Sequence, residues 1–238
     1  MAQLEEQIAR EFVEGFLGGE AVLEGYRAEI EEARLVEQLQ AGYEEFWGIV
    51  DPSTRYNTGR LGYEEGVRLY ALVRKLRPRV AVETGVCNGF STAFVLLALQ
   101  RSGGGELHSI DLPEIVGGDY EPGTFWDGKR GAAIPPGKEP GWMIPPELRE
   151  RWHLTVGRSQ EELPPLLERL GTIDLFVHDS EHSYECMDFE FRAAWPALRV
   201  GGALVADDWN WNDAFAELAR DAGRTPVTLG KKLALLLK

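Results

Sequence analysis

The chain has 238 residues, of which 44% are hydrophobic and 27% charged, and this composition is typical of a folded globular protein. Its net charge of −14 disfavours nucleic acid and anionic membranes as partners. Two cysteines are too few for a disulfide scaffold or a cysteine zinc site. Because Glu5 and Glu6 stand where a signal peptide needs positive charge, and no long apolar run follows, we expect a cytoplasmic protein.

The first 47 residues have apolar side chains three or four positions apart, which predicts helices. Gly18 and Gly19 interrupt the pattern and predict two helices rather than one. Residues 1–50 also carry twelve Glu against three Arg. We therefore expect residues 1–60 to form a helical extension that acts as a solvated cap or as a surface for homo-oligomer contacts, outside the catalytic unit.

From residue 61 onward, helical and strand patterns alternate. Helices are predicted over 63–76, 90–100, 160–170, 184–198 and 213–222, and strands over 79–83, 106–111, 153–156, 173–178, 203–207, 225–229 and 232–237. This order predicts an α/β domain over 61–238 with a doubly wound, seven-stranded, mostly parallel sheet. Ligands of such sheets bind at the carboxyl ends of the strands.

One connection, residues 112–150, is unusually long, and fourteen of its thirty-nine residues are Gly or Pro. Loops of this length in compact domains are usually functional or disordered. This one contains Tyr120, Phe125, Trp126 and Trp142, more aromatic residues than a disordered linker would hold. The mixture predicts an inserted lid over an organic acceptor, mobile until ligands bind.

The first predicted strand ends in the sequence VETGVCNGFST. Gly85 and Gly89 would let the backbone approach a ligand, and the following helix offers free N–H groups at its start. An ordinary strand-to-helix turn is the alternative. A dinucleotide fingerprint fits poorly, because Cys87 occupies the middle glycine position and Glu83 would repel a pyrophosphate. Asp111 ends the second strand, at the usual place of a carboxylate that binds a ribose diol.

These segments resemble class I S-adenosylmethionine (SAM) dependent methyltransferases, and within them the metal-dependent O-methyltransferases of the catechol and caffeoyl-CoA type. ETGVCNGFS fits their ELGxxxGYS motif, and VGRSQ at 156–160 is similar to the VGxSQ segment that contacts adenine. HDSEHSY and GGALVADD resemble segments of sugar O-methyltransferases as well. The resemblance implies that the cofactor is bound by Glu83, Gly85, Asn88, Gly89, Ser91, Asp111, Ser159, Gln160 and Asp179.

Three carboxylates follow the fourth and fifth predicted strands: Asp179, Asp207 and Asp208. Converging carboxylates repel one another unless a cation lies between them, and oxygen ligands favour Mg²⁺ or Mn²⁺. The alternative is that Asp179 and Asp208 cap the helices that follow. The resembled group holds its metal with Asp, Asp and Asn, so Asp208 departs from the pattern and makes the site more anionic.

His182 stands where the catechol-type enzymes place a lysine base, and histidine has a suitable intrinsic pKa for a base. A metal ligand or a structural hydrogen-bonding role is also open for it. His178, Cys87 and Cys186 are expected to be interior packing residues. Trp209 and Trp211 either wall the pocket or pack against the next helix.

The sequence thus predicts a SAM-dependent, Mg²⁺-dependent O-methyltransferase that acts on a hydroxyl of a small molecule, either a sugar or a phenol. Two alternatives are an NAD-dependent oxidoreductase on a Rossmann sheet and a SAM-binding protein without catalytic activity.

Overall fold

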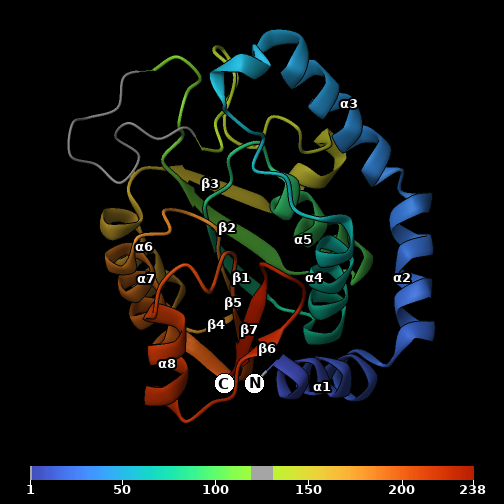
Figure 1. Ribbon diagram of the computed structural model, residues 1–238, viewed down its shortest axis with the longest axis vertical. Coiled ribbons are helices and arrows are strands. Elements are labelled where there is room, and N and C mark those ends of the chain that lie inside the picture. Colours follow the sequence, from blue (N-terminus) through green and yellow to red (C-terminus); the bar gives the residue numbers. More distant parts are fainter. Residues whose placement is uncertain (1, 119–130) are drawn as a thin grey trace.

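A computed structural model describes residues 2–118 and 131–238 and contains one seven-stranded sheet (Figure 1). Its strands are β1 (Val80–Thr84), β2 (Glu106–Asp111), β3 (Trp152–Val156), β4 (Ile173–His178), β5 (Leu198–Ala206), β6 (Val227–Thr228) and β7 (Ala234–Leu237), in the order β3-β2-β1-β4-β5-β7-β6. The first five are parallel, and β7 runs antiparallel to both neighbours. The predicted doubly wound fold is confirmed.

The central strands are apolar runs because helices cover both of their faces. All six residues of β4 are buried, whereas the edge strand β3 has no buried residue. One face carries α4 (Tyr63–Leu76) and α5 (Phe90–Arg101), and the other carries α6 (Ser159–Leu170), α7 (Tyr184–Ala197) and α8 (Ala214–Ala222) (Figure 1). Each face of the sheet therefore has its own hydrophobic core.

The N-terminal extension has more helices than its sequence predicts. It comprises α1 (Ala2–Phe12), a π-helical turn (Val13–Leu17), α2 (Glu20–Glu32) and α3 (Leu35–Ile49). The break expected at Gly18 and Gly19 is present, but a second one separates α2 from α3 at Arg34, whose φ of +53° lies in the left-handed region. An α-helix cannot continue through that conformation. Neither Gly nor Pro marks this break, so the sequence does not reveal it.

Helices α2 and α3 run along the outer side of α4 and α5, whereas α1 lies beside β6, and all of these helices contribute to one core (Figure 1). Leu23 and Ile30 of α2 are fully buried, and Glu29 accepts a hydrogen bond of 2.5 Å from the buried Tyr70 hydroxyl of α4. Because α5 lies between this layer and the sheet, every residue from Phe90 to Leu99 is buried. The extension is therefore packed into the domain rather than attached to its surface.

The described parts of the long connection are held in place by backbone pairing. Isolated bridges join Asn57 to Ala132 and Ile115 to Ile134. Pro146–Arg151 forms a 3₁₀ turn that leads into β3. Tyr120, Phe125 and Trp126 fall in 119–130 and lie outside the described residues. No helix in the described part of the chain combines the length and apolarity that crossing a membrane requires.

Candidate functional site

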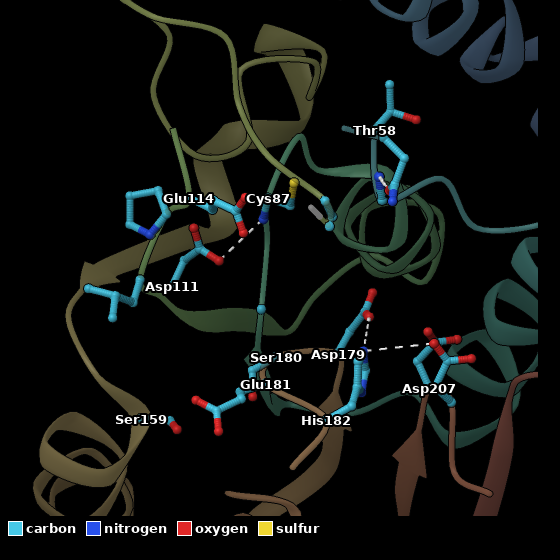
Figure 2. A pocket seen from close by; sticks show the side chains of 18 of the residues that line it. Thr58, Cys87, Asp111, Glu114, Ser159, Asp179, Ser180, Glu181, His182 and Asp207 are labelled. Carbon is cyan, nitrogen blue, oxygen red and sulfur yellow. Dashed lines mark hydrogen bonds and ion pairs between the residues drawn. The ribbon is translucent and has the colours of Figure 1, made fainter. Parts of the chain in front are cut away.

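A cavity of about 920 Å³ opens at the carboxyl ends of the parallel strands (Figure 2). Five predicted cofactor residues line it: Gly85, Asp111, Ser159, Gln160 and Asp179. They come from the ends of β1, β2, β3 and β4, where parallel strands bring side chains distant in sequence to one edge. The predicted metal residues Asp207 and Asp208 and the predicted base His182 line the same cavity.

Glu83, Asn88, Gly89 and Ser91 lie behind the cavity wall instead. The Glu83 carboxylate is fully buried and accepts hydrogen bonds from three hydroxyls, those of Ser91 (3.0 Å), Thr92 (2.9 Å) and Ser109 (2.8 Å). Burial raises the Glu83 pKa to about 7, although the three hydroxyls counteract it. In the structure, these residues fix the loop after β1 and do not face the cavity.

The two glycines of this loop are required by contacts inside the protein. Gly85 has a φ of +86°, and a Cβ there would lie 1.9 Å from the backbone oxygen of Asp179. Gly89 has a φ of +97°, and its Cβ would lie 2.6 Å from Ile144. From the sequence, we expected Gly85 and Gly89 to allow the close approach of a ligand. The structure shows that both glycines are required by close contacts with other segments of the same chain.

Asn88 connects this loop to two distant segments. Its amide nitrogen donates to the backbone oxygens of Thr58 (3.0 Å) and Ala133 (2.9 Å), and its amide oxygen accepts from the indole N–H of Trp142 (2.5 Å). The amide nitrogen also contacts Sγ of Cys87 at 3.2 Å, so the buried Asn88 side chain has four hydrogen-bonding partners. It therefore ties the first loop of the sheet to the N-terminal extension and to the long connection.

Only one of the two carboxylate oxygens of Asp111 accepts hydrogen bonds from the described residues. Oδ1 accepts from the backbone N–H groups of Val86 (2.8 Å) and Cys87 (3.2 Å), as Figure 2 shows in part. Oδ2 is buried without a hydrogen-bond partner among the described residues. Burial raises the pKa of Asp111. A buried acceptor without a donor is unfavourable, so this oxygen is available to accept a hydrogen bond from a hydroxyl group of a ligand.

Asp179, Asp207 and His182 form a compact cluster on the other side of the cavity (Figure 2). One nitrogen or oxygen from each lies within 4.8 Å of the other two. Burial and the adjacent Asp207 carboxylate raise the pKa of Asp179 well above its usual range, and burial with Asp208 raises that of Asp207 to about 6. Repulsion of this kind is relieved by a shared proton or a cation, and the donor set fits a divalent cation.

Asp208 lies beside this cluster and already has a cationic neighbour. Its Oδ1 is 3.4 Å from the Lys232 ammonium, and its Oδ2 is 3.9 Å from Nε2 of His182. The residue adopts a φ of +44°, which turns the chain sharply after β5. The structure thus brings all three predicted metal-binding carboxylates together, with Asp208 partly neutralised by Lys232.

The helix-capping alternative for Asp179 and Asp208 is wrong. The hydroxyl of Ser183 caps α7 by accepting from the backbone N–H of Cys186 at 3.2 Å. At the start of α8, the side chain of Asn212 accepts from the backbone N–H of Ala214 at 3.0 Å. The two aspartates are therefore available to a ligand.

His182 is a buried and neutral imidazole. Its Nε2 lies 3.9 Å from an oxygen of Asp179, and its Nδ1 has no hydrogen-bond partner among the described residues. Burial, with a smaller contribution from His178, lowers its pKa to about 3. The sequence suggests a base that titrates near neutrality, and burial is the reason the structure differs. Trp211 lies 5.0 Å from the His182 ring and lines the cavity, whereas Trp209 packs against Phe215.

A buried network behind β4 supports this cluster and was not predicted. Glu190 of α7 is fully buried, and its carboxylate contacts Nδ1 of His178 at 2.6 Å. It also accepts from the hydroxyls of Thr84 (2.5 Å) and Ser180 (2.7 Å). The prediction that His178 is an interior residue is confirmed. Nothing in the spacing of Glu190 along α7 distinguishes it from a solvated helix residue, so sequence reasoning missed it.

The N-terminal extension also contributes to the cavity, contrary to its predicted role as a part outside the catalytic unit. Tyr43 and Trp47 of α3, one helical turn apart, line it together with residues 57–61. The guanidinium of Arg60 lies 5.3 Å from the centre of the Tyr43 ring. Lys232, ahead of β7, lines the opposite part. The pair of aromatic residues and the polar segment NTGR are the only sequence signals of this contribution.

Comparisons with known proteins agree with this geometry. A family described as "Methyltransferase domain" matches residues 82–209. Among solved structures, the SAH-bound methyltransferase PaMTH1 of Podospora anserina is 12% identical, covers 89% of this chain and 95% of its own, and has a TM-score of 0.54. The O-methyltransferase NovP is 17% identical, with coverages of 74% and 80% and a TM-score of 0.52.

The O-methyltransferase of Bacillus cereus, solved with SAH, is 14% identical over the whole of both chains, with a TM-score of 0.50. At such identities, these structures establish the fold alone. No protein of curated function matches the chain. The family match covers more than half of the sequence and removes the NAD-dependent oxidoreductase alternative. The chain therefore belongs to the methyltransferase-domain family, and its seven-stranded sheet has the class I fold of SAM-dependent methyltransferases.

Proposed function

We propose that this protein transfers a methyl group from SAM to a hydroxyl of a small molecule. The observation that carries the proposal is Asp111, whose free Oδ2 is buried at the end of β2 beside the cavity. Methyl transfer to oxygen also accounts for the crowded acids and the imidazole at the far side of the cavity, which a cofactor-binding site alone does not require.

SAM fits the cavity in charge and in size. We assign the ribose diol to Asp111 and the adenine to Ser159 and Gln160 at the start of α6, because all three residues line the cavity. SAM supplies an electrophilic methyl group on a positively charged sulfonium. The acidic side chains of the cavity wall complement this charge. A volume of about 920 Å³ is near the upper end of small-molecule sites, so a second molecule can bind beside the cofactor.

We assign the cation site to Asp179, Asp207 and Asp208. The buried Oδ1 of Asp207, which lacks a hydrogen-bond partner among the described residues, supports this assignment. Oxygen donors select Mg²⁺ or Mn²⁺. A bound divalent cation would make a neighbouring hydroxyl more acidic.

The acceptor side of the cavity favours a ring that carries an acidic hydroxyl. Tyr43, Trp47 and Trp211 provide aromatic surfaces for such a ring. We propose His182, which lines the same cavity, as the group that accepts the hydroxyl proton. A phenol, with a pKa of about 10 as in tyrosine, gives up its proton more readily than a sugar alcohol. We therefore propose a phenolic acceptor.

Calorimetry with SAM tests the cofactor site. Asp111→Asn keeps an oxygen for the N–H groups of Val86 and Cys87 but removes the charged acceptor. We expect SAM affinity to fall at least about tenfold, because a hydrogen bond to a charged group contributes roughly 1.5–3 kcal/mol. Asp221→Asn, at an exposed aspartate paired with Arg192, is the matched control and should bind like wild type. Equal affinities of the two variants would contradict the assignment of Asp111.

Methyl transfer to a panel of catechols, other phenols and free or nucleotide-linked sugars tests the acceptor class. Turnover of phenols with Mg²⁺ present is the expected result. Turnover of sugars alone would refute the phenol assignment, and SAM binding without turnover on any acceptor would favour a non-catalytic SAM-binding protein.

A further inference from the structure

A second group of metal-ligand side chains lies on the edge of the sheet, apart from the cavity. Glu106 and His108 are two residues apart on β2, so both side chains project from the same face. His153 of β3 is the direct partner of His108 in the parallel register. None of the three lines the cavity described above. Two adjacent strands therefore place two imidazoles and a carboxylate at one spot.

The distances within this group fit a shared metal ion better than hydrogen bonds. One Glu106 oxygen lies 3.7 Å from Nε2 of His108 and 3.6 Å from Nε2 of His153, beyond hydrogen-bonding distance. The two imidazole rings are stacked with centroids 4.6 Å apart. Two ligands of one tetrahedral zinc ion, each bound at about 2.0–2.1 Å, stand roughly 3.3 Å apart. Because imidazole lone pairs lie in the ring plane and the two rings are nearly parallel, the half-exposed His153 ring must turn about its side-chain bonds for both Nε2 atoms to face one ion.

His108 supplies an independent reason to expect a ligand. Its side chain is only 8% exposed, and its Nε2 has no hydrogen-bond partner within the described ranges. A buried polar nitrogen without a partner is unfavourable and uncommon in native structures. Residue 108 pairs with Val82 on the face that α6 covers, so water has little access to this nitrogen.

Two of the three side chains are accessible from solvent. His153 and Glu106 have half-exposed side chains, at 51% and 56%, so an ion can enter from solvent.

We propose that Glu106, His108 and His153 bind Zn²⁺ or a similar borderline divalent metal, with the remaining coordination position open to solvent. Two imidazoles and a carboxylate form a ligand set typical of zinc, whereas Mg²⁺ prefers oxygen ligands alone. The ion would join the edge strand β3 to β2 and stabilise that edge of the sheet. This inference does not depend on the proposed methyl transfer.

Zinc binding to the full-length, metal-free protein tests the proposal. A chelator competition measures Zn²⁺ affinity for wild type, His153→Gln and Asp207→Asn. His153 is half exposed, so its variant should fold, and thermal unfolding without metal checks this. We expect His153→Gln to lose affinity at least about tenfold, since loss of even an outer partner of a ligand usually has an effect of this order. Asp207→Asn, in the cavity, should retain the tight edge site.

Thermal unfolding with and without Zn²⁺ provides a second readout, because a ligand that binds only the folded state raises the melting temperature. Zn²⁺ should raise it for Asp207→Asn, in which the cavity cluster is weakened, and much less for Asp207→Asn combined with His153→Gln or with Glu106→Gln. Excess Mg²⁺ should not displace the Zn²⁺. Wild-type affinity in both edge variants, or a loss seen only in Asp207→Asn, would overturn the proposal.

Discussion

Replacing Gly85 with alanine should displace the loop after β4, destabilise the fold and weaken SAM binding. The residue has a φ of +86°, and an added Cβ would lie 1.9 Å from the backbone oxygen of Asp179 and 2.6 Å from the nitrogen of Ser180. Both contacts are with backbone, which cannot rotate away. The loop after β4 must therefore move, and Asp179 moves with it.

Gly103→Ala is the matched control, because Gly103 has a similar φ of +79° but no atom within 4 Å of the added Cβ. The left-handed conformation alone destabilises a non-glycine residue by about 1–2 kcal/mol. Overpacking adds about 1–3 kcal/mol at Gly85, so we expect total losses of about 1–2 kcal/mol for Gly103→Ala and about 2–5 kcal/mol for Gly85→Ala.

Urea unfolding measures both losses, and calorimetry measures SAM affinity. The control should bind SAM like wild type, whereas Gly85→Ala should bind it at least about tenfold more weakly, a loss of about 1.4 kcal/mol. Equal stabilities of the two variants, together with normal SAM affinity of Gly85→Ala, would refute the argument that close approach of the β4 loop requires this glycine.

Three further predictions concern buried or clustered groups. Glu83 has a pKa of about 7 in the folded protein against an ordinary 4.5, so folding favours its protonated form. The resulting stabilisation is complete below pH 4.5 and is lost as the pH rises through 7. Glu83→Gln should remove this dependence, and urea unfolding between pH 4.5 and 8.5 should show the variant gaining about 3 kcal/mol relative to wild type. EDTA should abolish turnover and Mg²⁺ restore it, with SAM affinity largely retained; full activity after exhaustive chelation would make Asp179 and Asp207 structural. His182→Gln should lower kcat by about 10²–10⁴ with SAM affinity unchanged; loss of Mg²⁺ affinity instead would identify His182 as a ligand, and a normal kcat would exclude it as the base.

The sheet could be predicted from the sequence because its strands are short apolar runs bounded by turn residues. The bounds of β2 and β4 agree with those predicted, and both strands are almost wholly buried. The start of β5 was placed at residue 203 instead of Leu198, because Arg199, Gly201 and Gly202 interrupt its apolar pattern. The break at Arg34 was missed because its left-handed backbone occurs at a residue type other than Gly, Asn or Asp, so no turn residue marks it in the sequence.

The sequence predicted which residues at the strand ends line the cavity, but it did not predict properties that depend on the packing of distant side chains. Asp111, Asp179, Asp207 and Asp208 line one cavity as their positions after the strands indicate. The burial of His182, which lowers its pKa, depends on side chains distant in sequence. The positions of Glu83 and Ser91 behind the wall likewise follow from hydrogen bonds that no spacing along the chain reveals.

The extension that supplies Tyr43 and Trp47 lies outside residues 82–209, the part of the chain that the methyltransferase family shares. If the acceptor binds against these aromatic residues as we propose, acceptor choice is encoded in a segment that can diverge while the cofactor site stays constant. Two relatives with the same residues over 82–209 would then methylate different compounds. Exchange of residues 1–61 between them should transfer substrate preference, provided that the hydrogen bond from Asn88 to Thr58 is rebuilt across the junction.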